Sequence, residues 1–212
     1  MIAGSATNCL HESIRLRDNS ARSSDGKASD AELVGAIARG DQLSMRQLYE
    51  RHSTRVYRFA RRLGADHSAA EDLVSEVFLY VWRWGSTFAG RARVSTWLLA
   101  ITRNKALDII RRSPLKPFEQ IESVTLEDET DGPEVAVQKK QTASVLSGAF
   151  RNMSAADREI IDLVYYHENS INEVALILNI PKSTVKTRMF YARKRLSALL
   201  AQCGQDASQL LA

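Results

Sequence analysis

Residues 71–112 constrain the fold of this chain more than any other stretch. Apolar side chains recur there at every third or fourth position, once along residues 71–84 and again from Val94 onward, and this period predicts two amphipathic helices. A short basic turn that contains Gly90 separates them. A core needs only one side of each helix, so the composition of the other side is informative about function.

The first predicted helix carries an acidic stripe opposite its apolar side. The stripe has an apolar residue in its middle and consists of Asp72, Glu76, Leu79 and Arg83. The apolar side consists of Leu73, Val74, Val77, Phe78 and Val81. This separation predicts one buried side and one exposed side.

The second predicted helix places an aromatic, an amide, a carboxylate and a guanidinium group within one narrow arc: Trp97, Asn104, Asp108 and Arg111. Its opposite side carries Leu98, Leu99, Thr102, Ala106, Ile109 and Ile110. Aromatic rings stack on unpaired bases and arginine neutralises phosphate, so the arc suits a nucleic acid. The same pattern also fits a core tryptophan beside a solvated polar face, and the helix alone leaves both interpretations open.

Helix-capping signals divide the chain before this stretch. Ser29 with Glu32 is a capping box that starts a short helix ending at Gly40, and Asp41 caps a long helix ending at Gly64. The apolar stripe of the long helix includes His52, which we interpret as a packed residue at the edge of a core. A further capping box, Ser68 with Glu71, is predicted to start the acidic-striped helix. These helices predict a compact α-helical bundle over residues 28–113.

The segments around this bundle differ from it in composition. Residues 1–27 have few large apolar side chains and predict a disordered extension, with a DNA-contacting basic arm as the alternative. Residues 114–137 contain three prolines and a run of acids without cations, which is typical of a flexible linker. Helical periodicity returns over residues 138–203, and residues 204–212 form a tail. The predicted fold class is therefore all-α, with two small helical domains joined by an acidic linker.

The second domain ends in two helices joined by a tight turn. Ser170 with Glu173 caps the first, Asn179-Ile180-Pro181 breaks it, and a basic helix starts at Lys182. This arrangement is typical of a helix-turn-helix, whose second helix enters the major groove. The candidates for phosphate and base contacts are Lys182, Ser183, Thr184, Lys186, Thr187 and Arg188. A basic helical hairpin without a ligand is the alternative.

Charge placement supports a polyanionic partner and argues against an enzyme. The net charge is only +4, but residues 85–112 and 182–195 are basic, and the acidic block over residues 118–134 separates them. The four histidines are scattered, and Cys9 and Cys203 show no metal or disulfide spacing, so we expect no catalytic site, metal or cofactor. No signal peptide or membrane-spanning run is indicated, and we expect a cytoplasmic protein without direct membrane insertion.

The two informative stretches together resemble one protein family. Residues 71–78, 88–90, 95–98, 103–104, 107–108 and 111–112 are similar to region 2 of an extracytoplasmic-function sigma factor of bacterial RNA polymerase. Residues 180–181, 183–188 and 192–196 are similar to region 4 of the same family. The resemblance covers roughly residues 30–112 and 145–200, in the family's order and with an acidic linker between the two regions.

The resemblance implies a role for each surface. The stripe Asp72, Glu76, Leu79 and Arg83 is expected to dock on the coiled coil of the polymerase β′ subunit, and the linker is expected to thread toward the active-site cleft and RNA exit path. The expected partners are the β′ and β subunits of core polymerase and promoter DNA. The minus-ten element is expected to contact Phe88, Arg91, Arg93, Ser95, Trp97, Asn104, Asp108, Arg111 and Arg112. The minus-thirty-five element is expected to contact Lys182, Ser183, Thr184, Lys186, Thr187, Arg188, Tyr191 and Arg193. An anti-sigma factor is a further implied partner.

Several residues depart from the family's usual pattern. Ser75 stands where glutamine is usual, Val94 where an aromatic residue is frequent, and Tyr191 where a basic residue is common. Two other classes compete with a promoter-recognition subunit. A decoy that only titrates an anti-sigma factor would not need Lys186 and Arg188, and an ordinary helix-turn-helix regulator would not need the bundle of residues 28–113.

Overall fold

The computed structural model describes residues 28–112, 148–150 and 152–202. The elements in these ranges are all helical, which confirms the all-α prediction. Cα proximity divides the chain into two compact units, one of residues 1–115 with 172–180 and the other of residues 116–171 with 181–212. The predicted extension 1–27, the linker 114–137 and the tail 204–212 lie outside the described residues, as do residues 138–147.

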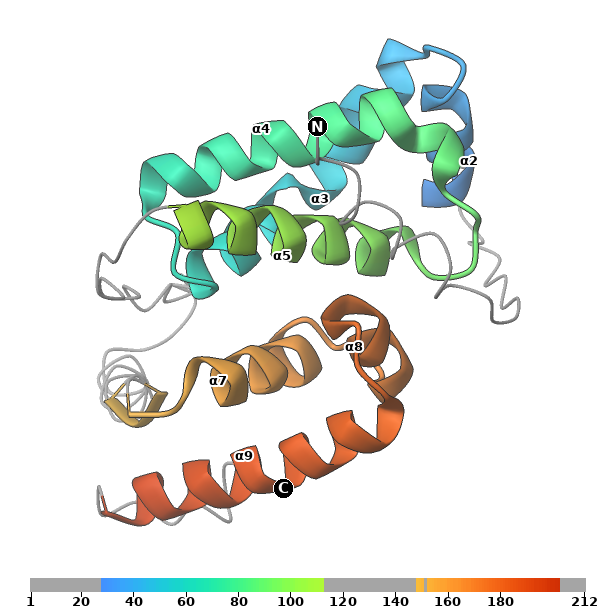
Figure 1. Ribbon diagram of the computed structural model, residues 1–212. Helices are drawn as coiled ribbons and strands as arrows, with labels where there is room; N and C mark the ends of the chain where they lie inside the picture. Colours follow the sequence, from blue (N-terminus) through green and yellow to red (C-terminus); the bar gives the residue numbers. More distant parts are fainter. Residues whose placement is uncertain (1–27, 113–147, 151, 203–212) are drawn as a thin grey trace, which may run out of the picture. The chain divides into compact units, whose positions relative to one another are not determined.

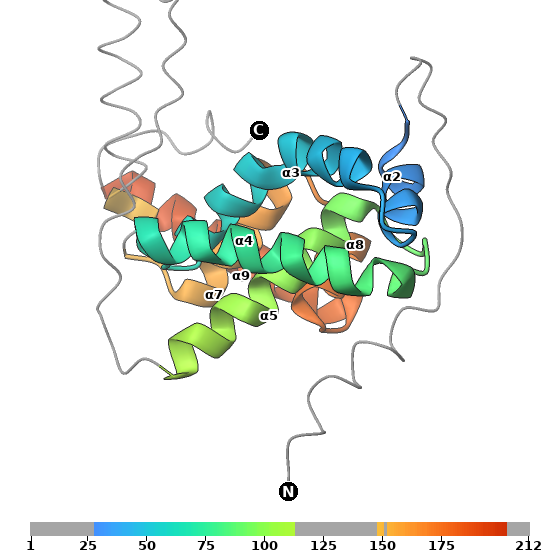
Figure 2. The ribbon, with the colours of Figure 1, turned by 90° about the horizontal axis from the view of Figure 1, so that it is seen from above.

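The first unit is built on three long helices that pack on one another. They are α3 (Gln42–Arg62), α4 (His67–Trp84) and α5 (Val94–Arg112). The shorter helix α2 (Asp30–Ile37) lies across the end where α3 begins and α4 ends, against the 3₁₀ turn η1 (Gly85–Thr87) (Figures 1 and 2). The unit therefore has the bundle architecture that the sequence predicts.

Local capping chemistry fixes where these helices begin, and one predicted cap is wrong. Ser29 and Glu32 form the expected capping box, with the Ser29 amide donating to Glu32 Oε2 at 2.7 Å, and Asp41 accepts from the Leu43 amide at 3.0 Å. The helix α4 is instead capped by Asp66, which accepts from the Ala69 amide at 2.8 Å. Because α4 already begins at His67, Ser68 lies within its first turn and cannot act as the cap.

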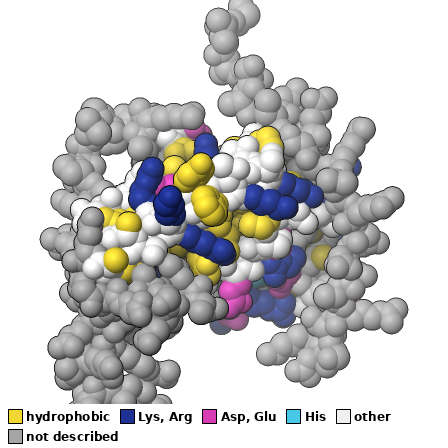
Figure 3. All heavy atoms as spheres, turned by 90° about the horizontal axis from the view of Figure 1, so that it is seen from below, with side chains coloured by type: hydrophobic (Ala, Val, Ile, Leu, Met, Phe, Trp, Pro, Cys, Tyr) yellow, Lys and Arg dark blue, Asp and Glu magenta, His cyan; other side chains and the backbone are white. Residues whose placement is uncertain are grey.

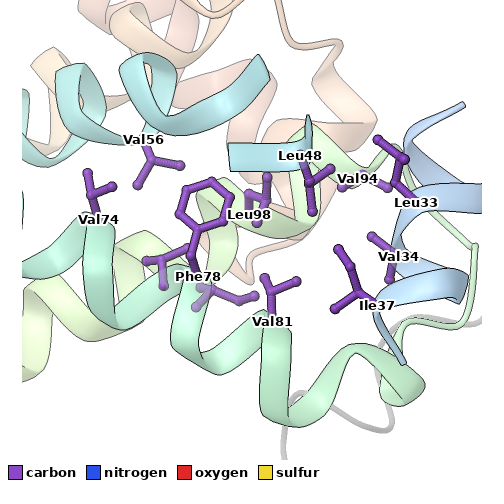
Figure 4. Close-up of a cluster of buried hydrophobic side chains, with 12 residues drawn as sticks. Leu33, Val34, Ile37, Leu48, Val56, Val74, Phe78, Val81, Val94 and Leu98 are labelled. Carbon is purple, nitrogen blue, oxygen red and sulfur yellow. The ribbon is translucent and has the colours of Figure 1, made fainter. Parts of the chain in front are cut away.

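One hydrophobic cluster holds α2, α3, α4 and α5 together (Figure 4). It is formed by Leu33, Val34, Ile37, Leu48, Val56, Val74, Val77, Phe78, Val81, Val94, Leu98 and Ile101. A smaller cluster of Ala60, Ala70, Leu73 and Ala106 continues the core. Ile109, which the periodicity assigns to the buried side of α5, is 37% exposed because it lies beyond this last layer of the core.

An ionic contact fastens α2 to α3. Asp30 Oδ2 lies 2.6 Å from His52 Nε2, and Arg51 Nη1 donates to Asp30 Oδ1 at 2.8 Å. The hydrogen bond from His52 lowers the pKa of the Asp30 carboxyl. His52 itself is buried, so its prediction as a packed residue at the core's edge is confirmed.

The second unit contains α7 (Ala155–Ile161), the π-helix η2 (Asp162–Tyr166) and the long helix α9 (Lys182–Gln202), with α7 packed on α9. Ser154 caps α7 and accepts from the Asp157 amide at 3.2 Å. The buried apolar residues of α9 recur along one side: Val185, Met189, Ala192, Leu196 and Leu200. Most residues on the remaining side of α9 are exposed.

The helix α8 (Ile171–Leu178) precedes α9 by a three-residue turn. Asn179 adopts a left-handed backbone with φ of 54°, and the Ile180 amide donates to the Ala175 carbonyl at 3.1 Å. This closure ends α8, and Pro181 follows as the residue before α9. The predicted break at residues 179–181 is therefore confirmed. Within the described ranges, no helix has the length and apolarity to cross a membrane.

Candidate docking and nucleic-acid surfaces

The acidic stripe of α4 forms one exposed surface. Asp72, Glu76, Leu79 and Arg83 follow one another at intervals of three or four residues along an unbroken helix, so they share one side, and all four are exposed. Leu79 is 47% exposed at the centre of this stripe. An exposed leucine between charged side chains is a feature of a docking surface, because it supplies apolar contact where the flanking charges set orientation.

One member of the stripe also contacts α5. Lys105 Nζ donates to Glu76 Oε2 at 2.9 Å, and the two residues are 29 positions apart in the sequence. The Glu76 side chain is 53% exposed and the Lys105 side chain is 28% exposed. The docking stripe is thereby linked to the helix that carries the nucleic-acid arc.

The loop between α4 and α5 begins with a compact turn. The Phe88 amide donates to the Gly85 carbonyl at 3.0 Å, and Thr87 Oγ1 donates to the Trp84 carbonyl at 2.7 Å. Gly90 follows with φ of 67°, a left-handed backbone that a larger side chain would strain. The turn places Arg91 and Arg93 on the exposed surface.

Trp97 lies in an aromatic cluster at the start of α5. Its ring centroid is 5.0 Å from that of Phe88 and 6.5 Å from that of Tyr80. All three rings are partly buried and pack against the main core cluster. Burial also raises the pKa of the Tyr80 phenol. The sequence predicts Phe88 and Trp97 as candidates but does not predict Tyr80. The only indication of Tyr80 in the sequence is its position as an aromatic residue one helical turn after Glu76.

The other candidates on α5 have different degrees of exposure. Asn104 is half-buried and Asp108 is exposed, and both share the side of α5 that carries Trp97. Ser95, in contrast, is 9% exposed and lies inside the first unit. Arg111 and Arg112 belong to α5, but their side chains lie outside the described residues.

The first turns of α9 present the second candidate surface. Most of its predicted contacts are exposed: Lys182, Ser183, Lys186, Thr187, Arg188, Tyr191 and Arg193. Thr184 is half-buried. Seen from the side nearest α9, basic side chains alternate with hydrophobic ones (Figure 3). This mixture of cations and apolar groups suits a duplex, whose phosphates and base methyl groups need both kinds of contact.

Phe190 is a candidate that the sequence reasoning missed. Its side chain is 63% exposed, and its ring centroid is 5.4 Å from that of Tyr191. Lys186 and Lys194 lie one helical turn before and after it. The guanidinium of Arg193 lies 5.4 Å from the ring centroid of Tyr165 in η2. The signal for Phe190 was present in the sequence, because it lies opposite the buried stripe Val185, Met189, Ala192 and Leu196.

Comparison with known proteins matches both helical regions of the chain to one family. The family models for Sigma-70 region 2 and Sigma-70, region 4 match residues 48–114 and 149–198. The chain is 32% identical over 173 residues to the ECF RNA polymerase sigma factor SigM of Mycobacterium tuberculosis, covering 81% of this chain and 85% of that protein.

Two solved structures are similar over most of the chain. CnrH in complex with the cytosolic domain of CnrY matches with a TM-score of 0.60 and 25% identity, covering 82% of this chain and 99% of that one. The sigma factor RpoE in complex with the anti-sigma factor NepR from Bartonella quintana matches with a TM-score of 0.54 and 25% identity, covering 74% of this chain and 96% of that one.

Proposed function

This chain belongs to the extracytoplasmic-function sigma factors of bacterial RNA polymerase, and from that premise we propose which of its surfaces performs each step of promoter recognition. As a member of this family it is a promoter-specificity subunit of RNA polymerase rather than an enzyme. The observation that carries the assignment of surfaces is the pairing of the exposed α4 stripe with the Trp97 cluster on the neighbouring α5.

The α4 stripe is the docking surface for core polymerase. Its acids, Asp72 and Glu76, require a cationic partner surface, and Leu79 supplies an apolar anchor at the centre. The residues assigned to this surface are those that the resemblance implied: Asp72, Glu76, Leu79 and Arg83. The charges set the orientation of the complex, and the leucine contributes most of the affinity.

The loop after α4 and the exposed side of α5 bind the opened minus-ten strand. Trp97 supplies a ring for base stacking, with Phe88 and Tyr80 holding it in place, and Arg91 and Arg93 lie near the phosphates. Binding of an unstacked base on this platform offsets the cost of unpairing it, which is roughly a few kcal/mol. Asn104 and Asp108 contribute polar contacts, whereas buried Ser95 supports the helix start and is not assigned a base contact.

The exposed side of α9 binds the minus-thirty-five duplex. Lys182, Lys186 and Arg188 neutralise phosphates at the first turns of the helix, where a helix-turn-helix enters the major groove. Phe190 extends the surface by an apolar contact of the kind that thymine methyl groups accept. The minus-thirty-five surface therefore has an electrostatic part and a sequence-reading part.

Regulation by an anti-sigma factor is part of the proposal. Solved relatives such as RpoE are bound to an anti-sigma factor, and the α4 and α9 surfaces are exposed in this chain. We assign the protein to the cytoplasm, where core polymerase and promoter DNA are found. The linker of residues 114–137 is assigned to the path toward the active-site cleft and RNA exit path of the polymerase.

In vitro transcription tests the proposal. Core polymerase is incubated with and without this protein on DNA fragments that carry candidate promoters, including the region upstream of its own coding sequence. New transcripts that start at defined sites support the proposal and reveal the minus-ten and minus-thirty-five sequences together. If the protein neither directs transcription nor is retained by immobilised core polymerase, the decoy becomes the better interpretation.

A further inference from the structure

The ion pair between Glu76 and Lys105 joins two surfaces that have different ligands. The Lys105 ammonium donates to Glu76 at 2.9 Å across the side-by-side helices α4 and α5 (Figures 1 and 2). Glu76 belongs to the stripe assigned to polymerase, and Lys105 directly follows Asn104 of the arc assigned to the minus-ten strand. One carboxylate is thus shared between a resident lysine and an incoming cationic partner.

Lys105 lies on the edge of α5 that also carries Trp97. Trp97 contacts Tyr80, Lys105 contacts Glu76, and Tyr80 and Glu76 are one turn apart on α4. The two α5 residues therefore face the same row of α4. A single strand stacked on Trp97 and running toward Asp108 passes Lys105, so its phosphates come within reach of a long, flexible lysine side chain.

We propose that Lys105 is a phosphate-binding residue of the minus-ten surface that Glu76 holds out of use until α4 docks on core polymerase. The inference rests on the proposed function of these two surfaces. When a cation of the partner takes the Glu76 carboxylate, the Lys105 ammonium is released and pairs with a phosphate. The sequence places Lys105 in the basic block of residues 85–112, but it does not reveal the pairing with Glu76, because that contact depends on how α4 packs on α5.

The exchange is energetically modest, which allows it to be reversible. An exposed ion pair of this kind changes an equilibrium by at most about fivefold. Coupling between two binding sites is reciprocal, so docking of polymerase strengthens strand binding by the same factor by which strand binding strengthens docking. The pair therefore acts as a small bias against strand binding by the free sigma factor.

The test uses the isolated full-length protein and a fluorescein-labelled oligothymidylate of about 12 nucleotides, which offers phosphates and stackable bases without a promoter sequence. Binding is followed by fluorescence anisotropy as a function of salt. The wild type is compared with Glu76→Gln, Lys105→Gln and the double variant. Asp72→Asn is the matched control, because it removes an equal charge one turn earlier on α4 and leaves the Glu76–Lys105 pair in place.

We expect Glu76→Gln to tighten binding about two- to fivefold at about 50 mM salt. The salt dependence should steepen by about 0.7 in log–log slope, the value for one additional phosphate of a single strand. In the double variant this gain in oligonucleotide affinity should disappear. Lys105→Gln alone should change the oligonucleotide affinity less than Glu76→Gln does. Equal gains from Asp72→Asn and Glu76→Gln, or a gain that persists in the double variant, would overturn the proposal, as would no measurable binding by any variant.

The affinity for core polymerase provides a second, independent test of the proposal. Lys105→Gln leaves Glu76 uncommitted, so affinity for core polymerase should stay unchanged or rise by up to about fivefold. A structural defect at Lys105 would lower it, and that result would also count against the proposal. Promoter-dependent transcription by the wild-type protein reports on the proposed function independently, so a failure of the ion-pair exchange is distinguishable from a failure of the sigma assignment.

Discussion

The two surfaces proposed to bind nucleic acid place their aromatic rings differently. On α5, Trp97 is partly buried and its ring is held between Phe88 and Tyr80 against the core. On α9, Phe190 and Tyr191 are 63% and 57% exposed. A ring fixed by the core suits stacking of an unpaired base, which needs a rigid platform, whereas exposed rings among cations suit a duplex groove.

The two surfaces also differ in how much their residues contribute to the packing of the fold. The platform on α5 is part of the hydrophobic cluster that holds the first unit together. The α9 residues assigned to the duplex lie opposite its buried stripe, and most of them are exposed. We therefore expect variants of the first surface to combine stability and function, and variants of the second to affect DNA binding alone.

The largest effect should come from Leu79→Asp, which tests whether docking is separate from both DNA surfaces. A carboxylate at the apolar centre of the stripe should weaken core-polymerase binding about 100-fold, because an apolar anchor is replaced by a charge that must be desolvated. A pull-down with immobilised core polymerase measures this, and circular dichroism should show an unchanged fold. Leu43→Asp, the same change at a leucine of α3 that is 72% exposed, is the control and should bind normally.

The next largest effect should come from Trp97→Leu, which tests the rigid platform. Loss of base stacking should lower promoter opening by the holoenzyme about tenfold or more. Permanganate reactivity of unpaired thymines reports opening, and duplex binding to the minus-thirty-five element should persist. Tyr57→Leu is the control, because it removes another partly buried ring from the same unit. An equal defect in promoter opening in that variant would mean that Trp97 acts through packing and not through base stacking.

A smaller effect is expected for Arg188→Ala, which tests the electrostatic part of the α9 surface. Duplex promoter binding should weaken about tenfold, and its log–log salt slope should become less negative by about 0.9, the value for one phosphate contact. Core-polymerase binding should be unchanged. Equal losses of promoter and polymerase binding would contradict the assignment of α9 to the minus-thirty-five element.

The smallest effect is expected for Phe190→Ala, which tests the sequence-reading part of α9. Once the minus-thirty-five sequence is known, deoxyuridine can replace each thymine and remove one methyl group at a time. At the thymine that Phe190 contacts, this change should weaken binding about fivefold in the wild type and have no effect in the variant. Fluorescence anisotropy measures the cycle, and Tyr191→Ala shows whether the sensitivity belongs to Phe190 or to either ring.

The family assignment could be predicted from the sequence because its evidence is local. The acidic stripe of α4, the basic start of α9 and the break at Asn179 depend on residues within a few turns of one another, where helical periodicity and backbone preferences act directly. The all-α class and the membership in the ECF sigma factors followed from these patterns and agree with the structure and the comparisons. Even the wrong cap of α4 was an error of only a few residues.

The tertiary structure decided which of those residues touch one another. The burial of Ser95, the support of Trp97 by Tyr80 and the pairing of Glu76 with Lys105 could not be predicted. The last two contacts join residues 17 and 29 positions apart, on helices whose relative rotation is set by core packing. Periodicity shows which side of a helix is buried. The neighbour that a residue at the edge of that side contacts depends on how the helices pack in three dimensions.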